Sequence, residues 1–151
     1  MKLYVDGDAF PNLLKPILFR AINRVHLQTI VVSNKCISIG DNSQFISYQI
    51  VEAGPDEADD RIVDLVEAGD LVITADIPLA DRIISKNAHA IGHRGKPFTV
   101  DNIKNVLALR DIMQGIRDSG EMTKGPSAFT KKDAHEFASQ LDKFLTKYYR
   151  K

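Results

Sequence analysis

Two short apolar stretches of the sequence each end in carboxylates: "YVDGD" near the N-terminus and "LVITAD" in the middle of the chain. The first places Asp6 and Asp8 on either side of a single glycine, and the second ends in Asp76. Clustered carboxylates repel one another, and oxygen ligands without cysteine favour a hard divalent cation such as Mg²⁺ or Mn²⁺. Such an ion polarises a phosphoryl oxygen and lowers the pKa of a bound water. The chemistry that fits these residues is hydrolysis of a phosphodiester bond.

A third group of carboxylates opens a predicted helix in "AGPDEADD". At about 100° per residue, Asp59 falls beside the apolar arc of this helix and Asp60 falls on the solvated side. A buried carboxylate is costly unless it is paired or bound to metal, so Asp59 joins the candidate site. Asp56, three residues earlier, is either a further ligand or an N-terminal cap. The candidate metal ligands are therefore Asp6, Asp8, Asp56, Asp59 and Asp76.

Structural explanations exist for the same residues. "DGD" after a strand could be a turn in which Gly7 has a positive φ. Asp76 could cap the helix that follows it. Asp81 is expected only to pair with Arg82 or Lys86 on a helix surface.

The net charge of zero conceals two halves of opposite sign. Residues 1–81 contain 6 Lys/Arg and 13 Asp/Glu, whereas residues 82–151 contain 14 and 7. The basic half is either a surface for a polyanion such as RNA or DNA, or a set of solvated helix faces. Arg94 and Lys96 in "GHRGK" are candidates for contacting substrate phosphates. Thr123 and Lys124 in "TKGP" could form an anion-binding nest or an ordinary turn.

Strands that alternate with helices are expected to position these residues. The predicted strands cover residues 2–5, 27–32, 47–51, 70–76 and 88–91. The predicted helices cover 11–24, a segment from "AGPDEADD" to about residue 68, 77–85, 101–117 and 131–149. In the first of them Pro16 either interrupts the pattern or marks the first turn of the helix. This alternation predicts an α/β fold with a mostly parallel sheet. Because the carboxyl ends of parallel strands meet at one edge, Asp6, Asp8 and Asp76 are expected to converge there.

Length and composition limit the class of protein. A chain of 151 residues with 44% hydrophobic and 26% charged residues predicts a single globular domain over residues 1–151. No apolar run approaches the ~18 residues of a membrane span, and the N-terminus lacks the pattern of a signal peptide. A single cysteine excludes an internal disulfide and a cysteine metal cluster. We therefore expect a cytoplasmic protein without a membrane partner.

Five motifs, in this order and spacing, resemble the YaiI/YqxD group of small bacterial proteins, also called UPF0178 or DUF188. They are "VDGDAFP", "GPDEAD", "GDLVITADIPLA", "HRGKPFT" and "TKGP", and the resemblance covers nearly the whole chain. The group is similar to the PIN-like nucleases, which implies a three-layer α/β/α sandwich with a carboxylate site for Mg²⁺ or Mn²⁺. The resemblance implies that Asp6, Asp59 and Asp76 are the catalytic carboxylates, with Asp81 only a loose match to a fourth. Two departures are "DGDAF" where the group usually has "DADAC", and "TKGP" for "TGGP".

The expected function is thus metal-dependent hydrolysis of RNA or DNA. One alternative is a phosphatase of the haloacid dehalogenase class, whose nucleophile motif is also D-x-D after a first strand. Thr74 would mimic the second motif of that class, but the acidic cluster "DEADD" precedes Thr74, so the order is wrong. The other alternative is a non-catalytic RNA-binding module in which the carboxylates are structural.

Overall fold

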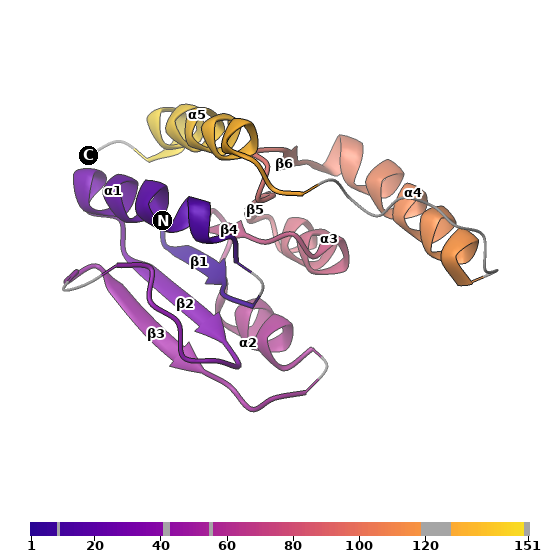
Figure 1. Cartoon of the computed structure of the whole chain (residues 1–151), viewed down its shortest axis with the longest axis horizontal. Coiled ribbons are helices and arrows are strands. Elements are labelled where there is room, and N and C mark those ends of the chain that lie inside the picture. Colours follow the sequence, from indigo (N-terminus) through magenta and orange to yellow (C-terminus); the bar gives the residue numbers. More distant parts are fainter. Residues whose placement is uncertain (9, 41–42, 55, 119–127, 150–151) are drawn as a thin grey trace.

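The structure is a computed structural model that describes residues 1–8, 10–40, 43–54, 56–118 and 128–149. Six strands within this part of the chain form one sheet in the order β3-β2-β1-β4-β5-β6 (Figure 1). The strands are β1 (Leu3–Asp6), β2 (Thr29–Ser33), β3 (Ile46–Ile50), β4 (Leu71–Ile73), β5 (His89–Ile91) and β6 (Pro97–Phe98). Neighbouring strands are parallel except β6, which runs antiparallel to β5. The predicted α/β class and mostly parallel sheet are confirmed.

Helices cover both faces of the sheet, so that the molecule has three layers (Figure 1). One face carries α1 (Lys15–Val25), a preceding 3-10 turn η1 (Asn12–Leu14), and α5 (Lys131–Tyr148). The other carries α2 (Glu57–Leu65) and α3 (Ile77–Ser85), against which α4 (Val100–Asp118) packs. No helix in the described ranges is both long and apolar enough to cross a membrane.

Alternate residues of the central strands supply two hydrophobic cores. In β1, Leu3 and Val5 face the α1 and α5 side, whereas Tyr4 faces α2 and α3. β4 divides in the same way, with Val72 on the side of Tyr4. Since both faces are covered, the strands read as continuous apolar runs, and this is why they were recognisable in the sequence.

Most observed element boundaries differ from the expected ones by a few residues, and β4 is shorter than the predicted 70–76. α1 begins at Lys15, with Pro16 in its first turn, where a missing N–H costs nothing. α2 ends at Leu65 because Val66 has extended backbone angles. β6 was not predicted: it has two residues, begins with a proline and follows a turn in which Gly95 has a φ of +91°. Such a short edge strand leaves almost no periodic signal.

Candidate functional site

The ends of two neighbouring strands place the first carboxylates. Asp6 is the last residue of β1, and β4, its parallel neighbour, pairs Ile73 with Val5. Asp76 follows β4 by three residues and occupies the N-cap of α3, where its Oδ1 accepts a 3.0 Å hydrogen bond from the N–H of Leu79. The structural explanation of Asp76 as a helix cap is therefore confirmed. Asp76 therefore both caps α3 and lies at the carboxyl edge of the sheet.

Thr74 connects these two carboxylates. Its buried hydroxyl donates a 2.9 Å hydrogen bond to Oδ2 of Asp6 and accepts a 3.0 Å hydrogen bond from the N–H of Asp76. The sequence analysis gave Thr74 a role only under the phosphatase alternative and did not include it among the residues of the carboxylate site. The signal available was its spacing in "TAD", two residues before the acid at the end of a buried strand.

Asp59 approaches the same edge from the first turn of α2. Burial raises the pKa of Asp59 to about 7, helped by the negative charges of Asp76 and Asp6 and by a hydrogen bond from the protonated Asp59 to Asp76. Its neighbour Asp60 is exposed and forms a 2.8 Å ion pair with Arg82. The helical wheel thus predicted correctly which of the two acids faces the protein.

The site concentrates negative charge in a partly buried place. Asp6 is only 8% exposed, and burial raises its pKa to about 6. The charges of Asp8 and Asp76 raise it further, while hydrogen bonds from Thr74 and the N–H of Asp8 act in the opposite direction. None of the candidate ligands forms an ion pair with Lys, Arg or His among the described residues, whose ion pairs all use other carboxylates. A bound cation would relieve this repulsion.

Asp8 and Asp56 lie around these carboxylates in different ways. Asp8 is partly buried and its Oδ1 accepts a 3.0 Å hydrogen bond from the N–H of Asn34. Asp56 is exposed at the N-cap position of α2, with a φ of +66°. Its side chain makes no capping hydrogen bond, so the cap explanation for Asp56 is wrong. Its charge still contributes to the raised pKa of Asp59.

Gly7 separates Asp6 and Asp8 because the chain passes close to β2. A Cβ at this position would lie 2.9 Å from Cδ1 of Ile37 and 2.9 Å from Cβ of Ser33. Gly7 does not have a positive φ, so the expected left-handed turn is not the reason for this glycine. The close approach is fixed by a 2.8 Å hydrogen bond from its N–H to the carbonyl of Val32.

The donor chemistry of this edge suits a hard divalent cation, because the candidate ligands are all carboxylates. Within the described residues, however, no three His, Cys, Asp or Glu side chains are grouped so as to hold a metal ion. Oδ2 of Asp6 accepts the hydroxyl of Thr74, and Oδ1 of Asp76 accepts the N–H of Leu79. These carboxylates lie at one edge of the sheet, and one oxygen of each is engaged by a protein donor.

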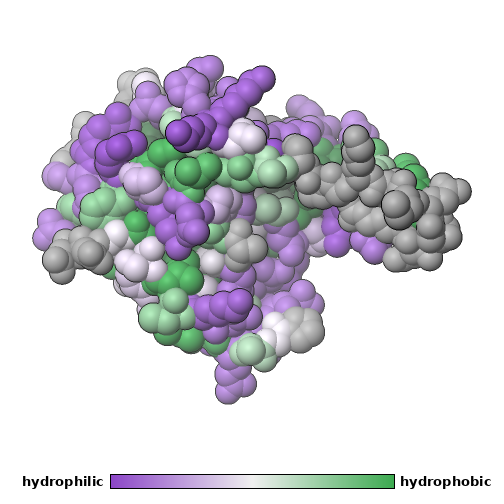
Figure 2. Space-filling model, in the orientation of Figure 1, coloured by the Kyte–Doolittle hydropathy of each residue, from purple (hydrophilic) through white to green (hydrophobic). Residues whose placement is uncertain are grey.

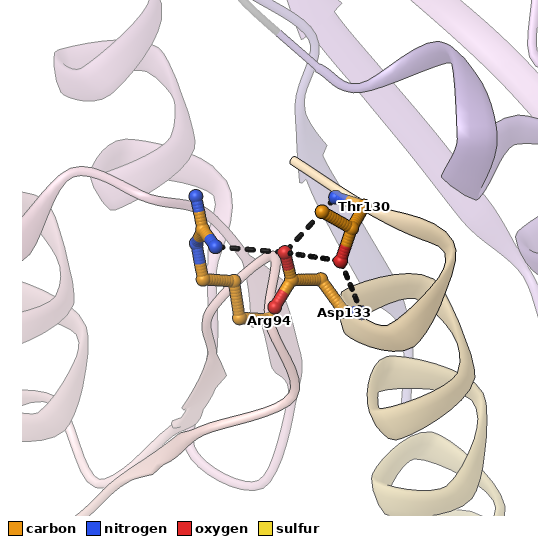
Figure 3. Close-up of polar contacts among 3 residues, drawn as sticks. All are labelled: Arg94, Thr130 and Asp133. Atoms are coloured by element: carbon orange, nitrogen blue, oxygen red, sulfur yellow. Dashed lines mark hydrogen bonds and ion pairs between the residues drawn. The ribbon is translucent and has the colours of Figure 1, made fainter. Parts of the chain in front are cut away.

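Arg94, a predicted phosphate contact, is joined to α5 in the structure (Figure 3). Its guanidinium lies 2.7 Å from Oδ2 of Asp133 and 5.7 Å from the ring centroid of Phe129. Asp133 and Thr130 form the capping box that begins α5. Arg94 therefore ties the turn after β5 to α5, and 40% of its side chain remains exposed to solvent.

The remaining predicted contacts divide into three cases. Lys96 is exposed in the turn between β5 and β6. Thr123 and Lys124 lie outside the described residues. Asp81 pairs with Lys104 of α4 at 3.1 Å, and the expectation that it pairs with Arg82 or Lys86 is wrong. The partner comes from a helix that is distant in sequence, which local spacing cannot reveal.

Two buried polar atoms at the same edge have no hydrogen-bond partner in the described part of the chain: Oδ1 of Asn34 and Nε2 of His93. Asn34 directly follows β2, and His93 follows β5 by two residues. Burial lowers the pKa of His93 to about 4, so its ring is neutral, and it packs edge-on against Phe10. Buried polar groups in proteins are usually paired, so these atoms offer an acceptor or donor to a ligand. Sequence reasoning gave neither residue a role.

Comparison with known proteins gives the family context. The DUF188 family model, described as "Uncharacterized BCR, YaiI/YqxD family", matches residues 4–147. The chain is 67% identical to a UPF0178 protein of Sulfurimonas denitrificans over 97% of both chains. It is 62% identical to a UPF0178 protein of Sulfurovum sp. over 97% of this chain and 99% of the relative. A UPF0178 protein of Nitratiruptor sp. is 56% identical over 96% of this chain and 95% of the relative. No solved structure matches the chain.

Proposed function

This chain belongs to the YaiI/YqxD family, and from the site that it carries we propose that it is a divalent-metal-dependent phosphodiesterase acting on nucleic acid. One observation carries the proposal. Burial raises the pKa of Asp6 to about 6, with the charges of Asp8 and Asp76 adding to the shift. Burial raises the pKa of Asp59 to about 7, with the charges of Asp76 and Asp6 adding to it. Within the described residues no lysine, arginine or histidine pairs with them. A fold that keeps repelling carboxylates together without a cationic partner is suited to bind a cation.

In this proposal Asp6, Asp59 and Asp76 hold Mg²⁺ or Mn²⁺, with Asp8 and Asp56 adding negative charge around them. When bound, the ion polarises a phosphoryl oxygen and lowers the pKa of a water molecule. Thr74 orients Asp6 through its hydroxyl. Without metal, Asp59 is protonated in part of the molecules at neutral pH, and cation binding displaces that proton.

The substrate is proposed to be nucleic acid, with RNA as the first choice. The excess of Lys and Arg after residue 81 supports a polyanionic substrate. Lys96, exposed after the carboxyl end of β5, is available to a phosphate at the same edge as the carboxylates. The exposed part of Arg94 lies in the same turn.

A non-catalytic RNA-binding module remains the second candidate. The observation that favours it is that Asp6 and Asp76 are engaged by Thr74 and Leu79, as purely structural carboxylates would be. The phosphatase alternative has less support, because Asp6 lacks an ion pair with a lysine among the described residues.

The test is cleavage of labelled RNA and DNA pools by the purified protein with Mg²⁺ or Mn²⁺. We expect cleavage by the wild type and by Asp142→Asn, whose exposed carboxylate on α5 pairs with Arg24. We expect Asp76→Asn to bind substrate and fail to cleave it. Cleavage that persists in excess EDTA, or at the wild-type rate in Asp76→Asn, would contradict the proposal.

A further inference from the structure

A cavity of about 270 Å³ lies between the edge of the sheet and the second half of α5. β5 and β6 form one wall, and α5 forms the other. We call it the α5 cavity. Six of its lining residues carry the argument: His89, Phe98, Lys143, Phe144, Lys147 and Tyr148. Figure 2 shows hydrophilic residues along the top of the molecule, where Figure 1 places α5.

Three rings in the α5 cavity pack against one another. The ring centroid of His89 lies 5.0 Å from that of Phe144 and 4.6 Å from that of Tyr148, and the rings of Phe144 and Tyr148 are 4.7 Å apart. Tyr148 is 46% exposed, so the group presents aromatic surface to solvent. Burial and the nearby Lys147 lower the pKa of His89, which favours the neutral ring. An exposed aromatic group of this kind is a surface on which a nucleobase stacks.

Two cations stand beside these rings. Lys143 and Lys147 are exposed, lie one helical turn apart on α5, and both line the α5 cavity. The ammonium group of Lys147 is 5.0 Å from the ring centroid of Tyr148. No aspartate or glutamate is among the described residues that line the cavity. Aromatic surface next to unopposed positive charge matches the alternation of base and phosphate in a single strand.

The aromatic rings of the α5 cavity lie toward the amino ends of the β-strands. Arg94, beyond the carboxyl end of β5, contacts Asp133 in the first turn of α5, whereas His89 at the start of β5 contacts Tyr148 at the end of α5. α5 therefore runs opposite to β5. The cavity is lined along the whole of β5, with the rings of His89 and Tyr148 at the amino end of that strand, whereas Asp6 is at the carboxyl end of β1. Nucleic acid bound to these rings would therefore contact the protein at a place other than the carboxylates.

We propose that the α5 cavity binds single-stranded nucleic acid, with a base stacked on the rings of His89 and Tyr148 and phosphates held by Lys143 and Lys147. The proposal rests on the proposed function for the nature of the ligand and adds a binding subsite to it. Binding energy from a remote part of a substrate is one source of catalytic specificity, which gives such a subsite a purpose.

Fluorescence anisotropy of a labelled single-stranded oligouridylate, measured in EDTA with the full chain, tests the proposal. We expect Lys143→Glu with Lys147→Glu to raise the Kd by ~10-fold or more and to reduce the slope of log K against log salt by ~1.4, as for two phosphate contacts. The matched control is Lys131→Glu with Lys132→Glu, the same charge change on exposed residues at the other end of α5. Equal losses in the two double variants would overturn the proposal.

Stacking is tested separately at Tyr148. Tyr148→Phe keeps the ring and should bind as the wild type, whereas Tyr148→Leu should raise the Kd by ~5-fold to ~150-fold. Circular dichroism of each variant monitors folding. Wild-type affinity in Tyr148→Leu would overturn the proposal even if the lysine variants bind weakly.

The outcomes also separate this inference from the proposed function. If the wild type binds the oligonucleotide but never cleaves it, and the Lys143→Glu, Lys147→Glu double variant loses this binding, the α5 cavity is supported and the phosphodiesterase is rejected. Cleavage by a wild type whose affinity is unchanged in Tyr148→Leu would reject the cavity and keep the phosphodiesterase.

Discussion

The hydroxyl of Thr74 donates a 2.9 Å hydrogen bond to the carboxylate of Asp6, which lies 68 residues earlier in the chain. The contact exists because β1 and β4 are parallel neighbours whose carboxyl ends coincide. The same hydroxyl accepts the N–H of Asp76. One buried side chain thus fixes Asp6 relative to the backbone that carries Asp76.

Replacing Thr74 tests this relationship. Thr74→Val keeps the shape but leaves Oδ2 of Asp6 and the N–H of Asp76 without their partner, so we expect a loss of about 1–3 kcal/mol of unfolding free energy. Thr74→Ser retains the hydroxyl, so its unfolding free energy should fall by less than that of Thr74→Val. Urea unfolding measures both. A Thr74→Val variant as stable as the wild type would show that the hydroxyl does not hold the site together.

The raised carboxyl pKa values predict how stability changes with pH. Burial raises the pKa of Asp59 in the folded state to about 7 from its ordinary 3.8, so between these values the folded state binds more protons than the unfolded state. Without metal, Asp59 should therefore lower the stability of the protein as pH rises through about 7. Asp59→Asn should remove this part of the slope and be more stable than the wild type at pH ~8.

Asp60→Asn is the matched control, because it makes the same change at the next residue, which is exposed. Thermal melting in EDTA at several pH values measures how the stability of the wild type, Asp59→Asn and Asp60→Asn changes with pH. The effect of His93, whose lowered pKa has the opposite sign, is common to all three proteins and cancels in the comparison. Parallel curves for wild type and Asp59→Asn would contradict the raised pKa of Asp59.

Gly95 is predicted to be needed for the docking of α5. It has a φ of +91°, and a Cβ there would lie 2.9 Å from the carbonyl oxygen of Glu136 in α5. Gly69 has a φ of +90° with no atom within 4 Å of a Cβ, so Gly69→Ala should cost only the ~1–2 kcal/mol of the backbone conformation. Gly95→Ala should cost distinctly more. Equal losses of unfolding free energy in the two variants, measured by chemical unfolding, would mean that α5 shifts to accommodate the added methyl group.

Lys96 and Arg94 should respond differently to truncation. Lys96→Ala should weaken RNA binding and reduce the magnitude of the salt slope by ~0.7 without changing stability. Arg94→Ala also breaks the ion pair with Asp133, so it should cost a further ~0.2–1 kcal/mol of unfolding free energy. Anisotropy across a salt series, combined with melting, distinguishes them. A salt slope unchanged in Lys96→Ala would exclude it as a phosphate contact.

The sequence was informative where patterns are local. Apolar runs ending in acids predicted β1 and β4 and the edge at which Asp6 and Asp76 meet, and helical spacing distinguished Asp59 from Asp60. The pairs Thr74 with Asp6 and Arg94 with Asp133 join residues far apart in the chain. Nothing local in the sequence signals such pairs, because they depend on which strands and helices become neighbours.

The central claim is that Asp6, Asp59 and Asp76 hold a divalent cation, and calorimetric titration of the metal-free protein with Mn²⁺ tests it most directly. We expect binding by the wild type and by Asp60→Asn, and an affinity reduced at least ~10-fold in Asp59→Asn. The affinity for Mn²⁺ should fall as pH drops below about 7, because protons then compete for Asp59. Absence of binding at millimolar Mn²⁺, or equal affinity in Asp59→Asn and Asp60→Asn, would contradict it.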